Sequence, residues 1–397
     1  MTTHYSMGEF FSGPGGLSLG ASMAAESFNK HVVPTRKDTV PIDLEHQWAV
    51  DIDRDSCETY RNNILAHRPQ AVRNIDARDA IRDLDSFESI DGFAFGFPCN
   101  DFSLVGKQKG LLGNFGGLYQ AGVAVLNKKE PKWFVAENVG GVRSANQGDA
   151  FKQILADLQV AKGKRYDIVP HLYRFEEYGV PQTRHRVIIV GIHRDAEVKF
   201  EVPKPTHGPR NNTLNLPRYV SAETALNAPY PAGLNVKHTE DPVHSERVQQ
   251  RLSYIPEGGN AFNAADMPEH LKLNVKGATL SHIYRRLKRE EPSYTITGSG
   301  GGGTHVYHWK DNRALTNRER ARIQTFPDTF NFAGSRESVR KQIGMAVPPL
   351  GAQVIFEALF KTLQGVPYDS IEPNLLSVLE DSRKISPSVT QNLHPAS

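Results

Sequence analysis

The chain is poor in cysteine and in long apolar runs. Its 397 residues include only two cysteines, Cys57 and Cys99, which excludes a disulfide framework. No apolar run approaches the ~20 residues that span a bilayer, and the first residues do not resemble a secretory signal. We therefore expect a cytoplasmic protein with reduced thiols and no membrane partner. The net charge of +3 permits a polyanionic partner without requiring one.

The composition, 39% hydrophobic and 23% charged, is that of an ordinary globular protein, and the length suggests more than one domain. The pattern changes near Pro205. From there to residue 312 the sequence is irregular and rich in proline, glycine, asparagine and histidine, which predicts a second, smaller domain at 205–312. Regular structure is predicted to resume at 313–365, followed by a polar tail at 366–397.

Cys99 follows an apolar segment, residues 93–97, that predicts a short buried strand. Pro98 ends this strand, because proline cannot donate to a sheet. Open α/β sheets carry their chemistry at strand exits of this kind. A cysteine is often only a small buried hydrophobe. The polar, glycine-containing segment that follows, residues 106–110, favours instead a nucleophilic thiolate beneath a mobile loop.

The N-terminal region has the pattern of a strand, a glycine-rich turn and a helix over residues 17–28, which is typical of nucleotide-binding α/β units. Residues 48–53 predict the next strand, and an inserted loop at about 30–47 separates the two. Asp51 ends that strand, where an acid can accept hydrogen bonds from ribose hydroxyls. Taken alone, the glycines are equally compatible with a plain tight turn, and Asp51 with a solvated charge.

Charged side chains also mark two later strands. Glu137 lies at the carboxyl end of the strand predicted at 132–139, where a partly desolvated carboxylate would suit a general acid. Arg184 and Arg186 begin the strand predicted at 187–192, and their period-two spacing places both on one face. Paired guanidiniums suit an anion or a carbonyl oxygen. The alternative for each of these residues is an exposed surface charge.

Six short segments occur in one order over most of residues 8–363. They are Phe-Ser-Gly-Pro-Gly-Gly-Leu (11–17), Gly-Phe-Pro-Cys (96–99), Glu-Asn-Val (137–139), Gln-Thr-Arg-His-Arg (182–186), Arg-Glu-Arg-Ala-Arg-Ile-Gln-Thr-Phe-Pro (318–327) and Gly-Met-Ala-Val-Pro-Pro (344–349). Each segment alone is weak evidence, whereas all six in order are specific. Together they resemble the DNA (cytosine-5)-methyltransferase family of the bacterial restriction–modification type.

The resemblance implies an α/β fold, a Rossmann-like sheet that binds S-adenosylmethionine, with a second, smaller, irregular target-recognition domain at 205–312. Residues 1–204 and 313–365 would form the catalytic and cofactor-binding domain. The cofactor-binding residues implied are Phe11, Gly13, Gly15, Gly16, Leu17, Asp51, Ile52, Asp76, Ala77, Gly96, Pro98, Leu118 and Val347. Among them, Phe11 and Ile52 would contact the adenine ring and Asp51 the ribose hydroxyls.

The resemblance also implies the chemistry. Cys99 would be the nucleophile, Glu137 the partner of cytosine N3 and of the amino group, and Arg184 and Arg186 would steady the ring carbonyl and the surroundings of the cysteine. Residues 101–117 would be the closing loop. The base would be flipped out of double-stranded DNA. We expect no metal, a monomer, and a cognate restriction endonuclease as the functional partner.

Three positions depart from the family pattern: Asn100, Phe115 and Met345 stand where Gln, Arg and Asn are usual. Other functions stay open. A tRNA-directed cytosine methyltransferase would share the same core, and a catalytically dead DNA-binding scaffold would keep the fold. A nucleotide-dependent oxidoreductase would explain the N-terminal 55 residues alone.

Overall fold

The computed structural model of the chain describes residues 2–97, 117–160, 165–273, 282–300 and 303–388. Internal contacts divide the chain into two compact units. The first unit comprises residues 1–174, 185–204 and 352–397, and the second comprises residues 175–184 and 205–351. Each unit has a hydrophobic core of its own.

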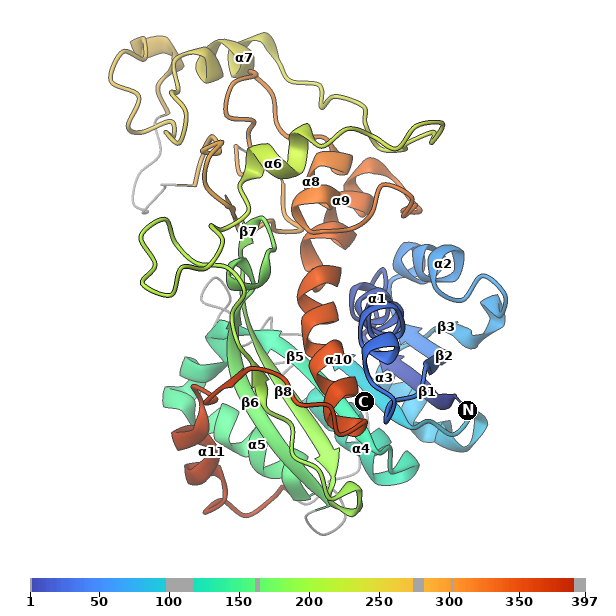
Figure 1. Ribbon diagram of the computed structural model, residues 1–397. Helices are drawn as coiled ribbons and strands as arrows, with labels where there is room; N and C mark the ends of the chain where they lie inside the picture. The colour runs from blue at the N-terminus through green and yellow to red at the C-terminus, as the bar shows by residue number, and fades with distance from the viewer. Residues whose placement is uncertain (1, 98–116, 161–164, 274–281, 301–302, 389–397) are drawn as a thin grey trace. The chain divides into compact units, whose positions relative to one another are not determined.

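The first unit is built on a seven-stranded sheet with the strand order β3-β2-β1-β4-β5-β8-β6 (Figure 1). The strands are β1 (Thr3–Phe10), β2 (Ile42–Asp51), β3 (Val72–Asn74), β4 (Gly92–Gly96), β5 (Trp133–Val139), β6 (Tyr166–Arg174) and β8 (His185–His193). Strands β1 to β5 are parallel, and β8 is antiparallel to both β5 and β6. The predicted α/β fold with a mostly parallel sheet is therefore confirmed.

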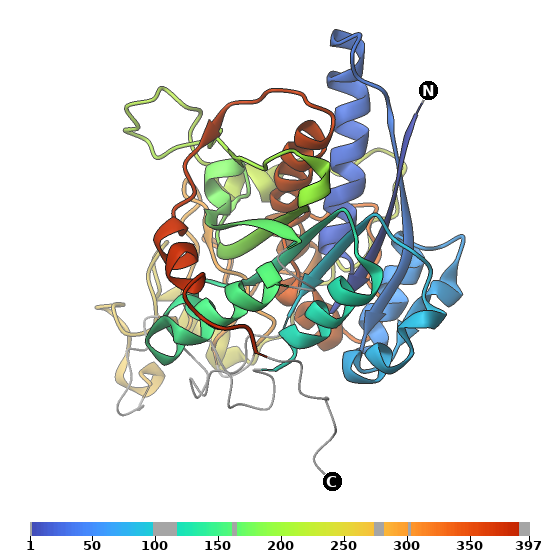
Figure 2. The ribbon, with the colours of Figure 1, turned by 90° about the horizontal axis from the view of Figure 1, so that it is seen from below.

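Helices cover both faces of this sheet because its strands are apolar on both sides. The helices of this unit are α1 (Gly16–His31), α2 (Arg54–Asn63), α3 (Ala77–Ala80), α4 (Tyr119–Lys129), α5 (Asp149–Val160), α11 (Leu376–Ser382) and most of α10 (Pro349–Leu363). Trp133 packs against Phe356 of α10, whereas the next residue, Phe134, packs with Phe95 and Tyr166 in the core that α4 and α5 share. Figure 2 shows α1 beside α10, and Ser27 of α1 donates to Glu357 of α10 at 3.0 Å.

Three features of the sheet differ from the sequence prediction, one of which is that the short strand β3 was not predicted. Strand β2 begins at Ile42, because residues 42–46 pair with residues 3–7 of β1. With α1 ending at His31, the connection is shorter than the predicted loop of 30–47. Strand β6 was not predicted at all. The alternation of apolar and polar residues along β6 is interrupted by His171 and by Pro170. Nevertheless, β6 pairs with β8 along its whole length.

The C-terminal segment continues the first unit. Strand β11 (Ser370–Ile371) pairs antiparallel with β9 (Val202–Pro203), and α11 follows. Ser388 then donates through its backbone N–H, at 2.8 Å, and its hydroxyl, at 2.6 Å, to the buried carboxylate of Asp157 on α5. The segment predicted as a polar tail is thus anchored to the core of the first unit as far as residue 388.

One run, Arg336–Leu363, has the length and apolar character of a membrane-crossing helix, and 72% of its most apolar window is buried. The run is divided, since α9 (Arg336–Met345) ends before Ala346, which is extended, and α10 begins at Pro349. It therefore consists of two packed helices, as in the core of a globular protein.

The second unit contains short elements joined by long irregular segments. They are β7 (Gln182–Thr183), α6 (Ala222–Asn227), α7 (Glu246–Ser253), β10 (Ser293–Tyr294), α8 (Asn317–Ile323) and α9. Thr316 and Glu319 form the predicted capping box at the start of α8. The core includes Leu252, Tyr284 and Tyr307. Compared with the predicted domain borders, residues 175–184 and 313–351 also belong to this unit.

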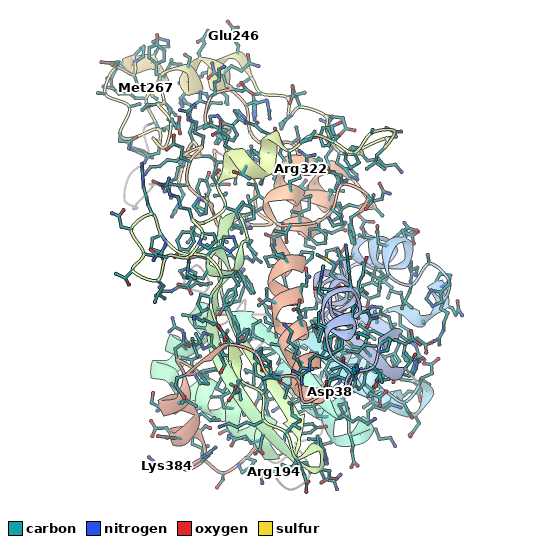
Figure 3. All side chains as sticks on the ribbon, viewed as in Figure 1. Asp38, Arg194, Glu246, Met267, Arg322 and Lys384 are labelled. Carbon is teal, nitrogen blue, oxygen red and sulfur yellow. The ribbon has the colours of Figure 1, made fainter. Side chains whose placement is uncertain are left out.

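Buried arginines hold the irregular backbone of the second unit together. Arg286 is 3% exposed and donates to the backbone carbonyls of Leu252 (2.7 Å), His308 (2.8 Å) and Asp311 (2.7 Å). Arg318 donates in the same way to Lys237, Pro327 and Phe330. Arg322 projects from α8 and donates to two carbonyls, of Leu226 and Ala228 (Figure 3). A planar guanidinium can satisfy several carbonyls that no helix or strand pairs.

Replacing Arg286 with lysine is therefore expected to destabilise the second unit by about 2–4 kcal/mol, because an ammonium cannot reach all the carbonyls and leaves buried acceptors unpaired. Limited proteolysis together with thermal unfolding measures the effect. Arg289→Lys is the matched control, since Arg289 is exposed and its guanidinium lies 3.9 Å from Glu290. Equal stability of the two variants would contradict the structural role of Arg286.

Candidate active site

The glycine-rich turn lies between β1 and α1. Strand β1 has β2 on one side and β4 on the other, so the order of the strands reverses direction here. Ligands of open α/β sheets bind at such a switch point. Phe11 (φ 54°), Gly13 (φ 53°) and Gly15 (φ 97°) all adopt left-handed backbone conformations. For Phe11 this conformation is strained, and such strain concentrates at functional sites. The turn also leaves the first amides of α1 without a side-chain cap, which suits a ligand carboxylate.

Asp51 joins the turn to the end of β2. Its carboxylate accepts from the backbone N–H of Gly13 at 2.8 Å and from that of Asp53 at 2.8 Å. A Cβ added at Gly13 would meet no atom of the described residues within 4 Å, so space is open beside the turn. Ile52 is 69% exposed, and an isolated apolar side chain at a strand exit can cover a ring. This arrangement fits the ribose and adenine of a nucleoside.

Five further residues predicted to bind the cofactor lie along the same edge of the sheet. Gly16 and Leu17 begin α1, and Leu118 is buried just before α4. Asp76 caps α3, and a 2.6 Å contact with Arg78 lowers the pKa of its carboxyl. Ala77 is buried behind it.

Glu137 and Arg186 form an ion pair where β5 meets β8. Arg186 Nε lies 2.9 Å from Glu137 Oε1, and the two side chains, of Arg186 and Glu137, are 12% and 14% exposed. The parallel register pairs Gly96 with Glu137, and a Cβ added at Gly96 would lie 3.3 Å from Glu137 Oε2. The absence of a side chain at Gly96 therefore leaves room for the carboxylate beside the end of β4.

Asn138 connects this pair to the exit of β4. It is buried, and its side-chain amide donates to the carbonyl of Phe97 at 3.1 Å. Phe97 is the last described residue before Pro98, Cys99 and most of the predicted closing loop 101–117, which lie outside the described residues together with Asn100 and Phe115. Sequence reasoning placed Asn138 in a motif but assigned it no role.

Arg184 and Arg186 have different partners. Strand pairing is interrupted at Arg184, which is 1% exposed and belongs to the second unit. Its guanidinium donates to the carbonyls of Ile296 (3.0 Å), Gly344 (3.1 Å) and Ala346 (2.8 Å). The expectation that both arginines share one strand face assumed an unbroken strand. These contacts show that Arg184 joins the backbone near Ile296 to the backbone at Gly344 and Ala346. Its catalytic role stays a prediction.

The predictions made for residues 344–349 also concern the second unit. Val347 is buried there, between α9 and α10, and its contact with the cofactor stays a prediction. Met345, which replaces a usual asparagine, is 66% exposed at the end of α9. Among the described residues, no group of three or more His, Cys, Asp or Glu side chains could hold a metal ion.

Comparison with known proteins decides the family. The family model for C-5 cytosine-specific DNA methylases matches residues 5–361. The chain belongs to this family. It is a DNA (cytosine-5-)-methyltransferase, EC 2.1.1.37, as the six segments predicted.

The relatives of this methyltransferase include bacterial type II enzymes. It is 52% identical over 366 residues to the type II methyltransferase M.BbvI of Brevibacillus brevis, a match that covers 92% of this chain and 93% of that protein. It is 41% identical to M.NgoFVII of Neisseria gonorrhoeae, covering 86% and 82% of the two chains. The resemblance to the restriction–modification type is confirmed.

Solved structures share the fold of the methyltransferase. An E. coli prophage protein described as a DNA modification methyltransferase gives a TM-score of 0.64 at 21% identity, over 90% of this chain and 99% of that one. EhMeth of Entamoeba histolytica gives 0.54 at 15% identity, over 91% and 98%. At these identities the likeness concerns the fold alone.

A buried polar cluster beneath the glycine turn of the methyltransferase was missed by sequence reasoning. Glu9 is 1% exposed, and its carboxyl accepts from the hydroxyls of Ser18 and of Tyr60, the latter at 3.2 Å. Tyr60 also supports the turn, because a Cβ added at Gly15 would lie 3.0 Å from its ring. Burial raises the pKa of Glu9 to about 8. A glutamate placed directly before two phenylalanines and the glycine-rich turn was the available signal.

Glu9 should make the methyltransferase less stable as the pH rises. Its pKa is about 8 in the fold against an ordinary 4.5, so the folded state holds one more proton between these values. The contribution of Glu9 to the free energy of unfolding is therefore greatest below about pH 4.5. It falls as the pH rises to about 8, by at most about 1.4 kcal/mol per pH unit.

Replacing Glu9 with glutamine removes this titration while keeping a hydrogen-bonding side chain. We expect the variant to unfold at a higher temperature than the parent at pH 8.5, and the difference to shrink toward pH 5.5. Thermal unfolding monitored between these pH values measures it. A difference that does not change with pH would contradict the raised pKa of Glu9.

Proposed function

We propose that this enzyme methylates carbon 5 of cytosine within a specific duplex DNA sequence, with S-adenosylmethionine as the methyl donor, through base flipping and a covalent adduct of Cys99. The observation that carries the proposal is the Glu137–Arg186 pair at the carboxyl end of β5, next to Gly96 and the exit of β4 that leads to Pro98 and Cys99. Family membership supplies the reaction class, and this pair supplies groups that fit a cytosine ring.

The residues around the glycine turn fit S-adenosylmethionine. The uncapped amides at Gly16 and Leu17 suit its methionine carboxylate, Asp51 its ribose hydroxyls, and the exposed Ile52, with Phe11, its adenine ring. We assign Gly13, Gly15, Asp76, Ala77, Gly96, Pro98, Leu118 and Val347 to the same pocket by their places in the family segments. When bound, this molecule supplies an electrophilic methyl group.

Carbon 5 of cytosine is a weak nucleophile until the ring loses its aromaticity. The thiolate of Cys99 adds to carbon 6, and the electron pair of the 5,6 double bond becomes available at carbon 5 for the methyl group. Glu137 supplies a proton to N3, its other carboxyl oxygen accepts from the amino group, and the negative charge that the addition creates on the ring is thereby stabilised. Arg186 holds the Glu137 carboxylate in position and can reach the ring carbonyl. Methyl transfer leaves the sulfonium sulfur as a neutral thioether. Water then accepts the carbon-5 proton, and departure of the thiolate restores the ring.

We propose that residues 205–312 carry the sequence recognition. A cytosine can reach Cys99 only after it has been flipped out of the base stack, and flipping costs a few kcal/mol. Contacts of the protein with phosphates and with the grooves of the DNA offset this cost. Exchanging residues 205–312 for those of a relative should move the methylated sequence, as sequencing of modified DNA would show. Buried arginines of residues 313–351 bind the exchanged segment through its backbone carbonyls, as Arg318 does at Lys237. A relative's segment also has these carbonyls, so the exchange can preserve the hydrogen bonds. An unchanged target sequence would contradict the assignment.

The type II names of the relatives support a role in protecting host DNA from a partner restriction enzyme, in the cytoplasm. We propose that the enzyme acts as a monomer without a metal. Challenging DNA that carries this gene with restriction enzymes of overlapping specificity tests protection. Cleavage equal to that of unmodified DNA would exclude it.

A mechanism-based trap tests the reaction most directly. Duplexes carrying 5-fluorocytosine should form a denaturant-stable complex with the enzyme, because fluorine cannot leave as the carbon-5 proton does. The complex should require S-adenosylmethionine and should not form with Cys99→Ala. The same duplex with ordinary cytosine is the control. Trapping on tRNA in preference to duplex DNA would favour the alternative substrate, and trapping without Cys99 would overturn the mechanism.

A further inference from the structure

Arg320 in the second unit is a buried cation without a carboxylate of its own among the described residues. It lies on α8, is 2% exposed, and donates to the carbonyl of Leu315 at 3.5 Å and to Nδ1 of His305 at 3.3 Å. The adjacent Glu319 is held by two 2.8 Å hydrogen bonds from Arg313. A buried charge is costly unless it is paired, so the described surroundings of Arg320 are short of negative charge.

Arg320 fixes the protonation of His305. A guanidinium can only donate, so Nδ1 of His305 is the acceptor and the ring proton lies on Nε2. Burial, followed by the charges of Arg320 and Arg340, lowers the pKa of His305 to about 4. His305 is therefore a neutral side chain at physiological pH, and it presents one oriented N–H donor.

Arg340 adds a second cation at the same place. Its Nε is buried without a partner in the part of the chain that the structure describes, and Nη2 lies 3.2 Å from Glu337, which is 82% exposed. A Cβ added at Gly300 would lie 2.5 Å from Arg340 Nε and 2.9 Å from Cε1 of His305. Backbone, guanidinium and imidazole therefore converge at a position where a side chain would not fit.

Donors and positive charge exceed acceptors and negative charge among the described residues at this convergence. The side chains of Arg340, which is 16% exposed, and of His305 are partly accessible, whereas the Nε atom of Arg340 and the side chain of Arg320 are buried. We propose that Arg340, His305 and the backbone at Gly300 bind a backbone phosphate of duplex DNA, with Arg320 as a positioning charge. A phosphodiester offers the acceptor oxygens and the negative charge that this cluster needs. The proposal rests on the proposed function, that the enzyme acts on duplex DNA.

The salt dependence of DNA binding tests the site. A plot of log K against log salt concentration should lose about 0.9 from its slope in Arg340→Gln, because one phosphate contact is lost. The loss of affinity should be the same on target and unrelated duplexes, since a phosphate carries no sequence. Arg340→Lys keeps the charge and should retain most of the slope. Lys384→Gln, which removes an exposed lysine that pairs with Asp381 of α11, controls for net charge.

A slope for Arg340→Gln equal to that of the parent would overturn the proposal. Thermal unfolding and limited proteolysis of the second unit, in which Arg340 lies, check that each variant is folded. Stabilisation of the parent, but not of Arg340→Gln, by inorganic phosphate at constant ionic strength, combined with an unchanged slope for DNA, would assign the site to free phosphate and contradict a DNA contact. If the parent methylates duplex cytosine while the slope is unchanged, only the phosphate site fails. If the parent methylates no duplex, the proposed function fails instead.

Discussion

Serine in place of Cys99 is expected to lower methyl transfer by about 10³-fold or more while DNA binding is retained. The thiolate is the attacking species, and a serine hydroxyl is far less ionised at neutral pH and is a poorer nucleophile. Removing an attacking group usually costs several orders of magnitude in turnover. Transfer of labelled methyl groups to duplex DNA measures the rate, and gel mobility measures binding.

The second cysteine offers a matched control. Cys57 is fully buried beside β2, and burial raises the pKa of its thiol to about 12. Cys57→Ala should therefore keep methyl transfer and lose only stability, as expected for a small buried side chain. Near-normal turnover of Cys99→Ser would show that Cys99 is not the nucleophile. Equal losses in the two cysteine variants would point to folding as the cause.

Replacing Glu137 with glutamine is expected to lower the rate about 10²–10⁴-fold, the usual contribution of a positioned acid or base. Glutamine keeps the shape of the side chain next to Gly96 but cannot hold the N3 proton or balance Arg186. Because the carboxylate acts on charge that develops during addition, DNA affinity should change much less than the rate. Single-turnover kinetics and equilibrium binding separate the two.

Glu88→Gln removes an exposed carboxylate that pairs with Arg68 at 2.8 Å, and it should leave both quantities unchanged. Arg186→Gln should resemble Glu137→Gln, since each residue is the other's ion-pair partner, and the double variant should lose less than the sum of the two. Parallel losses of rate and DNA affinity in Glu137→Gln would contradict a role confined to the reaction.

Local signals in the sequence were sufficient for the elements that hold the site. Apolar runs predicted the strands that became β4 and β5, and the glycines predicted the turn before α1. Thr316 and Glu319 predicted the start of α8, because a capping box involves only four consecutive residues. Each of these signals depends on neighbours in the chain, so no knowledge of distant contacts was needed.

Other features depended on partners far along the chain. Strand β6 contains Pro170 and a buried His171, and only its pairing with β8 makes it a strand. Arg286 stands in a basic run, residues 285–289, yet it is buried and donates to the carbonyls of Leu252, His308 and Asp311. A sequence does not show which arginine will satisfy an irregular backbone, because the acceptors come together only on folding.

By itself, the sequence determined the family, the reaction class and, in the first unit, the glycine turn before α1 and the strands β4 and β5, since these depend on ordered motifs and local periodicity. The tertiary structure alone decided that Arg186 pairs with Glu137 whereas Arg184 ties three carbonyls, and that Glu9 is buried with a raised pKa. The physical reason is that the charge and hydrogen bonding of a side chain depend on desolvation and on its partners. Packing between segments far apart in the chain sets both.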